Sequence, residues 1–147
     1  MIPLLPPAGA PGFLLLPVLF GFVAAGLAWQ FNKGLGRLPG AVPVCLAPLV
    51  EEMAKTVPAA FFNVDIFYTH FIFGLVEGTW ELLSGRPAGF YAGLTAVASH
   101  SIFGFSTVLV LQTRGSLVLA LGTAVLAHAA WNHVVFRYLE KTPGAKR

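Results

Sequence analysis

The stretch AVPVCLAPLVEEMAKTVPAAFF, residues 41–62, is an apolar segment with three charged residues, Glu51, Glu52 and Lys55, near its middle. It is long enough for one crossing of a bilayer, because an α-helix rises about 1.5 Å per residue and the hydrocarbon core is about 30 Å thick. A charged side chain at the bilayer centre costs roughly 2.5–3.5 kcal/mol on insertion scales. We therefore expect these three side chains to face the interior of a helix bundle and to meet other polar groups there.

The composition of the whole chain agrees with a membrane protein. Hydrophobic residues make up 56% of the 147 residues and charged residues only 10%, whereas soluble domains carry about 25% charged residues. This composition disfavours a water-soluble fold. The one cysteine, Cys45, excludes an internal disulfide and a metal site built from several cysteines, and we expect it to be a buried, small apolar residue.

Five apolar runs, separated by segments with glycine, proline or charge, predict five membrane-spanning helices. We therefore predict an all-α integral membrane protein, a bundle of about five transmembrane helices in a single domain over residues 1–147. The start of the chain lacks the basic residues of a signal peptide, so the first run is expected to be a retained span. The predicted spans are Phe13–Phe31, Ala41–Phe62, Ile66–Leu83, Gly89–Leu111 and Leu117–Phe136.

The basic residues predict the orientation of these spans. With five crossings, Arg114 lies alone on the side of the N-terminus. Because cytoplasmic loops are enriched in lysine and arginine, we predict an external N-terminus and a cytoplasmic C-terminus, in what we expect to be a prokaryotic plasma membrane. The residues on the cytoplasmic side are Lys33, Arg37, Arg86, Arg137, Lys141, Lys146 and Arg147.

Ionisable residues recur at similar depth in the later spans. Glu77, His100 and His128 each lie about eleven residues into their runs, close to the level of the two adjacent glutamates in the second run. We expect these groups to converge on one hydrated pocket, and the first span, which has none, to serve as scaffold. His70 and Glu81 lie nearer the ends of the third run, where we expect them to reach interfacial water.

The second run contains two further local signals. Lys55 follows Glu51 by four residues, a spacing that permits an ion pair along a helix. Pro48 removes a backbone donor, so it is expected either to kink the helix or to start a half-helix with both glutamates in its first turn.

The last two runs carry polar residues at helical spacing. In the fifth run His128 and Asn132 are one turn apart and project together, while His133 points about 100° away and is expected at the interface. The fourth run has a stripe of mostly small residues that would let a neighbouring helix approach closely. This stripe consists of Gly93, His100, Gly104 and Thr107.

Four motifs follow one another on successive predicted helices. They are Glu51-Glu52-x-x-Lys55, Phe73-x-x-x-Glu77, His100 within a small-residue helix, and His128-x-x-x-Asn132. This pattern resembles the PrsW family of intramembrane proteases, which is related to the CAAX prenyl protease and bacteriocin-processing (CPBP, Abi) superfamily. The resemblance implies hydrolysis of peptide bonds at or within the membrane, by a glutamate-type or a metal-dependent mechanism. The chain departs from the family in its short length and in Glu77-Gly78, where the family often has Glu-Asn.

The metal-free version of this chemistry needs a base and donors to an oxyanion. Glu51 or Glu52 would take a proton from a water held against His100, since a buried carboxylate suits a general base. His128 and Asn132 would donate hydrogen bonds to the tetrahedral intermediate. The substrate would be a membrane-anchored protein or peptide.

The metal-dependent version uses the same residues differently. His100, His128 and Glu51 would hold Zn²⁺ with one position open for water, and the neighbouring glutamate would be the base. Lys55 and Glu77 would support the site in either version. The residues alone do not choose between the two.

Three other functions use the same residue types. A proton-coupled transporter or channel would use glutamate and histidine as a relay. A haem-binding membrane protein would use His100 and His128 as axial ligands. A structural subunit of a larger complex would use the polar groups only for hydrogen bonds between helices.

Overall fold

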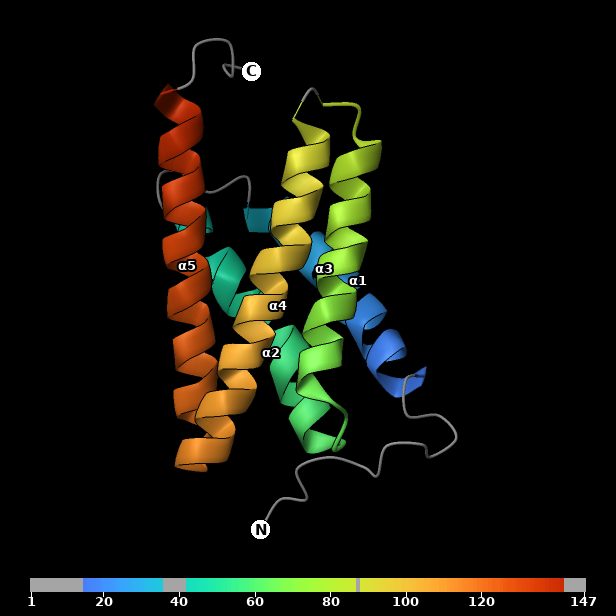
Figure 1. Cartoon of the computed structure of the whole chain (residues 1–147), viewed down its shortest axis with the longest axis vertical. Helices are drawn as coiled ribbons and strands as arrows, with labels where there is room; N and C mark the ends of the chain where they lie inside the picture. Colours follow the sequence, from blue (N-terminus) through green and yellow to red (C-terminus); the bar gives the residue numbers. More distant parts are fainter. Residues whose placement is uncertain (1–14, 36–41, 87, 142–147) are drawn as a thin grey trace.

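The computed structural model describes residues 15–35, 42–86 and 88–141, and every element in them is an α-helix (Figure 1). The all-helical prediction is confirmed, and three predicted spans begin where their helices begin. The predicted starts Phe13 and Ala41 lie outside the described residues, as do Arg37, Lys146 and Arg147. The helices are α1 (Leu15–Leu35), α2 (Val42–Phe61), α3 (Ile66–Leu83), α4 (Gly89–Arg114) and α5 (Leu117–Lys141).

Two expectations about helix boundaries need correction. Helix α2 runs unbroken through Pro48 and Pro58, so the half-helix beginning at Pro48 is wrong. Helices α1, α4 and α5 continue three to five residues beyond the predicted ends. Lys33 and Arg114 lie in the last turns of α1 and α4, and a helix can continue past an apolar layer when such side chains reach water.

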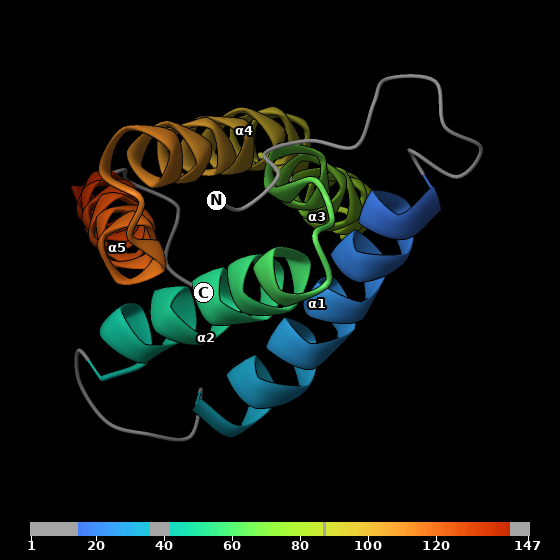
Figure 2. The same ribbon diagram turned by 90° about the horizontal axis from the view of Figure 1, so that it is seen from below.

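Successive helices run in opposite directions (Figure 1). Helices α3, α4 and α5 follow the long axis of the molecule, whereas α1 and α2 are inclined to it (Figure 2). Helix α3 packs against α1 and most extensively against α4, while α2 packs against α1, α3 and α5. In the described residues α2 and α4 do not pack directly against each other, so long side chains are needed to bridge them.

Glycines bring α3 and α4 close together. A Cβ atom on Gly78 would lie 2.8 Å from the carbonyl oxygen of Gly93, and one on Gly104 would lie 2.6 Å from the Cβ of His70. Any larger residue would force the helices apart. The close approach expected from the small stripe of the fourth run is confirmed at Gly93 and Gly104.

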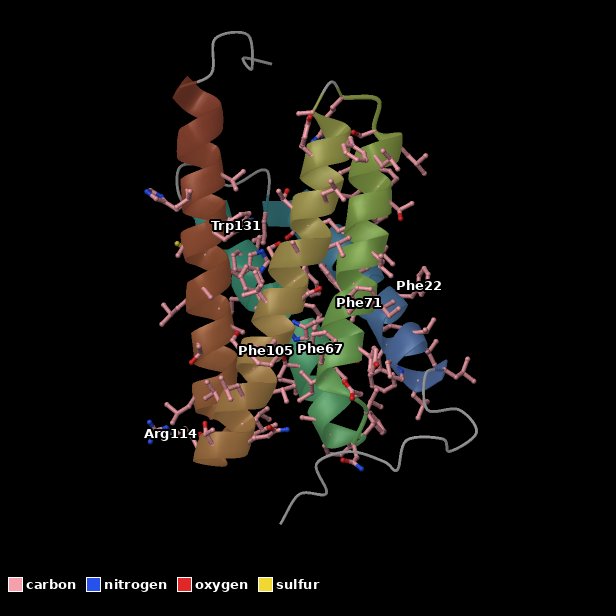
Figure 3. All side chains as sticks on the ribbon, viewed as in Figure 1. Phe22, Phe67, Phe71, Phe105, Arg114 and Trp131 are labelled. Carbon is pink, nitrogen blue, oxygen red and sulfur yellow. The ribbon has the colours of Figure 1, made fainter. Side chains whose placement is uncertain are left out.

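The polarity of the molecule is inverted relative to a soluble domain. Its exposed side chains include Phe22 and Phe105, which are 58% and 61% exposed, and Figure 3 shows apolar side chains projecting outward along the bundle. The interior contains buried glutamate, lysine and histidine. Cys45 is exposed on α2, so its predicted burial is wrong. An apolar residue gains nothing from the interior when the surrounding medium is itself apolar.

Three helical segments among the described residues are long and apolar enough to cross a membrane. They are Leu15–Leu35, Gly89–Arg114 and Leu117–Val135. Helix α2 differs from them because it carries three charged residues in its centre, and α3 carries His70, Glu77 and Glu81. The protein is therefore a helical protein with the character of a membrane protein.

Candidate active site

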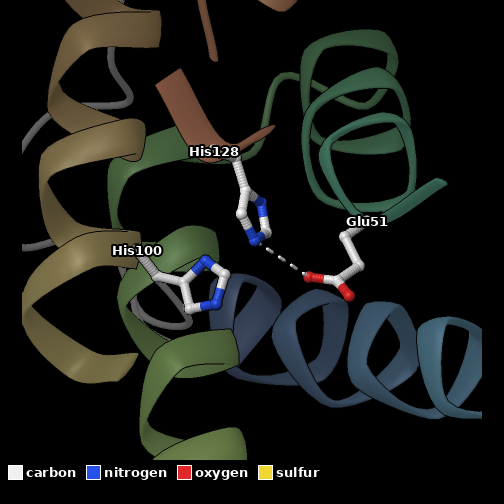
Figure 4. Close-up of side chains that lie close together, drawn as sticks. All are labelled: Glu51, His100 and His128. Carbon is white, nitrogen blue, oxygen red and sulfur yellow. Dashed lines mark ion pairs between the residues drawn. The ribbon is translucent and has the colours of Figure 1, made fainter. Parts of the chain in front are cut away.

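The ionisable residues of α2, α4 and α5 meet in the centre of the bundle. Glu51, His100 and His128 are buried and face one another from three helices (Figure 4). Glu52 is completely buried beside them. The structure thus brings together the four ionisable residues that the sequence singled out as catalytic.

Lys55 pairs with a different glutamate from the one expected. Its Nζ donates to Glu52 Oε1 at 2.6 Å, three residues away on α2, and the predicted pair with Glu51 does not form. The same Nζ donates to His100 Nδ1 at 2.9 Å and lies 4.3 Å from the centre of the Phe73 ring. Lys55 therefore bridges α2 and α4, because its long side chain crosses the space that the two backbones leave between them.

The Glu52 carboxylate also fixes the orientation of His128. His128 Nδ1 lies 2.9 Å from Glu52 Oε1, the oxygen that accepts from Lys55. An ionised carboxylate only accepts, so His128 carries its proton on Nδ1. Its other ring nitrogen, Nε2, faces Glu51 Oε2 at 3.7 Å (Figure 4).

Glu51 is held from the side of α1. Asn32 Nδ2, one residue beyond the predicted first span, donates to Glu51 Oε1 at 2.9 Å, so α1 contributes a side chain to the cluster. A search for ionisable residues missed Asn32 because its side chain is neutral. The available signal was an amide side chain directly after the predicted apolar run Phe13–Phe31.

Glu77 joins the cluster through His100. His100 Nε2 lies 2.5 Å from Glu77 Oε2, and the Glu77 side chain is 43% exposed. With Lys55 donating to Nδ1, His100 must carry its proton on Nε2 and donate it to Glu77. Glu77 is thus the outermost member of a chain of hydrogen bonds that runs inward to Glu52.

His70 lies in the core and not at the interface. It is completely buried, its Nε2 lies 3.1 Å from Thr56 Oγ1, and its Nδ1 lies 3.6 Å from Glu52 Oε2. Neither Nδ1 of His70 nor Oε2 of Glu52 has a hydrogen-bond partner within the described part of the chain. The signal that could have placed His70 inside is its helical stripe with Gly74 and Glu77.

The remaining predicted residues lie at the edge of this cluster. Asn132 is half-buried one turn after His128, and no hydrogen bond joins its side chain to another described residue. Glu81 accepts from Arg86 at 3.2 Å near the end of α3, and its position at the membrane interface stays a prediction. His133 is exposed, as expected.

A cavity of about 400 Å³ lies between α1 and α3 and reaches the cluster. Its walls are mostly apolar and include Phe22, Trp29 and Trp80, while Glu51 and Glu77 line its polar part. Glu52 and Lys55 do not line it. Of the two adjacent glutamates, Glu51 is therefore the one that a molecule in the cavity would meet.

The cluster also has some features of a metal site. Three possible ligand atoms, one each from Glu51, His100 and His128, lie within 4.8 Å of one another. They could surround one ion if the three side chains moved closer together. Both nitrogens of His100, however, already have partners in Lys55 and Glu77.

Comparisons of the chain with protein-family models, curated proteins and solved structures found no match.

Proposed function

We propose that this protein is an intramembrane protease that hydrolyses peptide bonds of membrane-anchored proteins. The observation that supports it best is the arrangement of Glu51 and His128, the latter held by Glu52, beside a largely apolar cavity. A carboxylate that orients a histidine, next to a second group able to accept a proton, is a common arrangement for activating a nucleophile. The order of the four motifs, which resembles the PrsW family, supports the same function.

Glu51 is the general base in this proposal. His128 is the neutral imidazole in this proposal, with its hydrogen on Nδ1, so Glu51 Oε2 and His128 Nε2, which lie 3.7 Å apart, are both acceptors and do not bond to each other directly. A water molecule that donates to both would satisfy them. As the water oxygen attacks the carbonyl carbon, Glu51 takes its proton, and it returns that proton to the amine nitrogen when the carbon–nitrogen bond breaks.

His100 is the donor to the oxyanion in this proposal. The sequence favoured His128 and Asn132 for that role, but the proton of His128 is on Nδ1 and engaged by Glu52. The Nε2–H of His100 points to Glu77, a half-exposed residue at the cavity wall. A substrate carbonyl that displaced Glu77 would receive that hydrogen bond.

The cavity provides the substrate site. Its apolar walls on α1 and α3 suit a hydrophobic segment of a membrane-anchored chain, and its polar part contains the proposed base. We further propose that all five helices cross the bilayer, with the N-terminus outside. Helices α2 and α3 would then be shielded from lipid on their charged faces by their neighbours.

A proton-coupled transporter is the second candidate, because hydrogen bonds link Glu77, His100, Lys55, Glu52 and His128 in one chain. A relay across a membrane needs ends at opposite sides of the bundle. Here Glu77, at one end of the chain, and Glu51, which faces His128 at the other end, line the same cavity, and this favours a hydrolytic site. Proton flux into liposomes that is lost with Glu77→Gln, without any proteolysis, would favour the transporter.

The test compares Glu51→Gln with the wild-type protein. Each is expressed in cells, and new N-termini of membrane proteins are counted by mass spectrometry. We expect the substitution to lower their formation at least about 100-fold, because a general base contributes about 10²–10⁴-fold. The control is Asp65→Asn, an acid-to-amide change at the α3 N-cap, where asparagine still caps the helix. Equal cleavage by folded Glu51→Gln and wild type would remove the proposal.

A further inference from the structure

Lys55 is an unusual residue for the centre of an apolar bundle. It is completely buried, and its Nζ contacts Glu52 Oε1, His100 Nδ1 and the face of Phe73. An isolated buried ammonium is very costly, so this environment is built to keep the charge. The proposed mechanism does not otherwise use it.

The contact with His100 limits what that histidine can bind. A neutral imidazole has one nitrogen with a hydrogen and one with a lone pair. Lys55 has only hydrogens to offer, so it takes the lone pair on Nδ1 at 2.9 Å. The other nitrogen, Nε2, carries the hydrogen that Glu77 accepts. His100 therefore has no lone pair left for a metal ion.

The positive charge of Lys55 also disfavours a bound metal ion. A divalent ion bound by Glu51, His100 and His128 would lie in the same buried cluster as the ammonium group. Like charges repel strongly where water is excluded. The ammonium also neutralises Glu52, so this carboxylate contributes no uncompensated charge that would attract a dication.

We propose that Lys55 is a built-in cation that keeps zinc and other divalent metals out of the Glu51–His100–His128 cluster and fixes His100 as the Nε2–H tautomer. This inference rests on the proposed function only in its consequence, which is that the hydrolysis is metal-free. Metal binding itself is measured without any substrate. Lys55 is in this sense a positioning residue for His100.

The experiment removes the cation and measures the metal. Full-length wild type, Lys55→Met and Lys55→Arg are purified in detergent, incubated with ZnCl₂, dialysed and assayed for bound zinc. We expect Lys55→Met to bind one zinc ion per chain at least 100-fold more tightly than wild type, because His100 Nδ1 and Glu52 are freed. Lys55→Arg keeps the positive charge and should behave as wild type. Adding His128→Ala to Lys55→Met should abolish the zinc binding.

Stoichiometric, tight zinc in the wild-type protein would overturn the inference, as would a folded Lys55→Met that binds no more zinc than wild type. If Lys55→Met does not fold, the zinc content of the wild-type protein and the protonation of its His100 still test the inference. Long-range ¹⁵N–¹H spectra report which imidazole nitrogen carries hydrogen, and His100 should show hydrogen on Nε2 alone. Hydrogen on Nδ1 would overturn the proposal.

These results are separable from the proposed function. Zinc in a wild-type protein that cleaves peptides contradicts the role of Lys55 and leaves the protease intact. A wild-type protein that excludes zinc but cleaves no peptide supports the role of Lys55 and contradicts the protease.

Discussion

At the scale of single residues, the site depends on hydrogen bonds from neutral side chains to ionisable ones. Asn32 fixes one oxygen of Glu51 at 2.9 Å and leaves the other facing His128. Thr56 holds the imidazole of His70 at 3.1 Å. Such contacts orient an ionisable side chain without adding charge to a region where charge is costly.

Asn32→Ala tests this orientation. The substitution removes a hydrogen bond to a carboxylate, which contributes about 1.5–3 kcal/mol, and we expect cleavage to fall about 10- to 100-fold, since about 1.4 kcal/mol corresponds to a factor of ten in rate. The rate is measured on a membrane-anchored reporter cut by the wild-type protein. Gln30→Ala, an exposed position on the same helix, should leave the rate unchanged. Equal rates for both variants would show that Asn32 does not position the base.

At the scale of elements, the pairing of α3 and α4 sets the position of His100. Gly78 and Gly93 touch through their backbones, and a Cβ on Gly74 would lie 3.0 Å from the Cβ of His100. This close approach brings the imidazole within reach of Glu77 on the facing helix. Helix α2 approaches α4 only through side chains, which leaves room for the polar cluster.

Gly78→Ala tests the close approach. The added methyl would meet the Gly93 carbonyl oxygen at 2.8 Å, and overpacking of this kind typically costs about 1–3 kcal/mol. We expect a corresponding loss in the free energy of unfolding, measured by denaturant titration in mixed micelles. Gly122→Ala on α5 meets nothing within 4 Å, so it should be neutral or stabilise by up to about 1 kcal/mol through helix propensity. Equal stabilities of the two variants would contradict the packing argument.

At the scale of the whole molecule, apolar side chains cover the outside and charged groups fill part of the inside. In an apolar solvent this arrangement is the favourable one, because polar groups find partners only within the protein. The basic residues predict the orientation of the bundle. Arg114 lies at the end of α4 (Figure 3), whereas Lys33 and Arg86 lie at or just after the C-terminal ends of α1 and α3, which run in the opposite direction to α4 (Figure 1).

Thiol labelling tests the proposed five crossings. In a Cys45→Ala background, Phe62→Cys and Gln112→Cys should react with a membrane-impermeant reagent in intact cells. Phe62 follows α2 and Gln112 lies in the last turn of α4, and we expect both helices to end outside. Ala88→Cys, between α3 and α4, should react only after lysis. Protection of Phe62→Cys in intact cells, with Gln112→Cys labelled, would mean that α2 and α3 do not cross the bilayer.

The helices and the depth of the ionisable residues followed from the sequence alone. Apolar runs and the glycine, proline and charged residues between them predicted where α3, α4 and α5 begin, because hydropathy and turn signals are local properties. The level at which Glu52, His100 and His128 meet also followed, since depth depends only on the rise per residue.

The partners of those residues were decided by tertiary structure. Spacing along α2 allowed Lys55 to reach Glu51, yet it pairs with Glu52 because His100 from α4 and Phe73 from α3 surround its Nζ on that side. The burial of His70 and the contact of Asn32 with Glu51 likewise depend on how each helix is rotated and tilted against its neighbours. Rotation and tilt come from packing between distant segments, and no local pattern of residues specifies them.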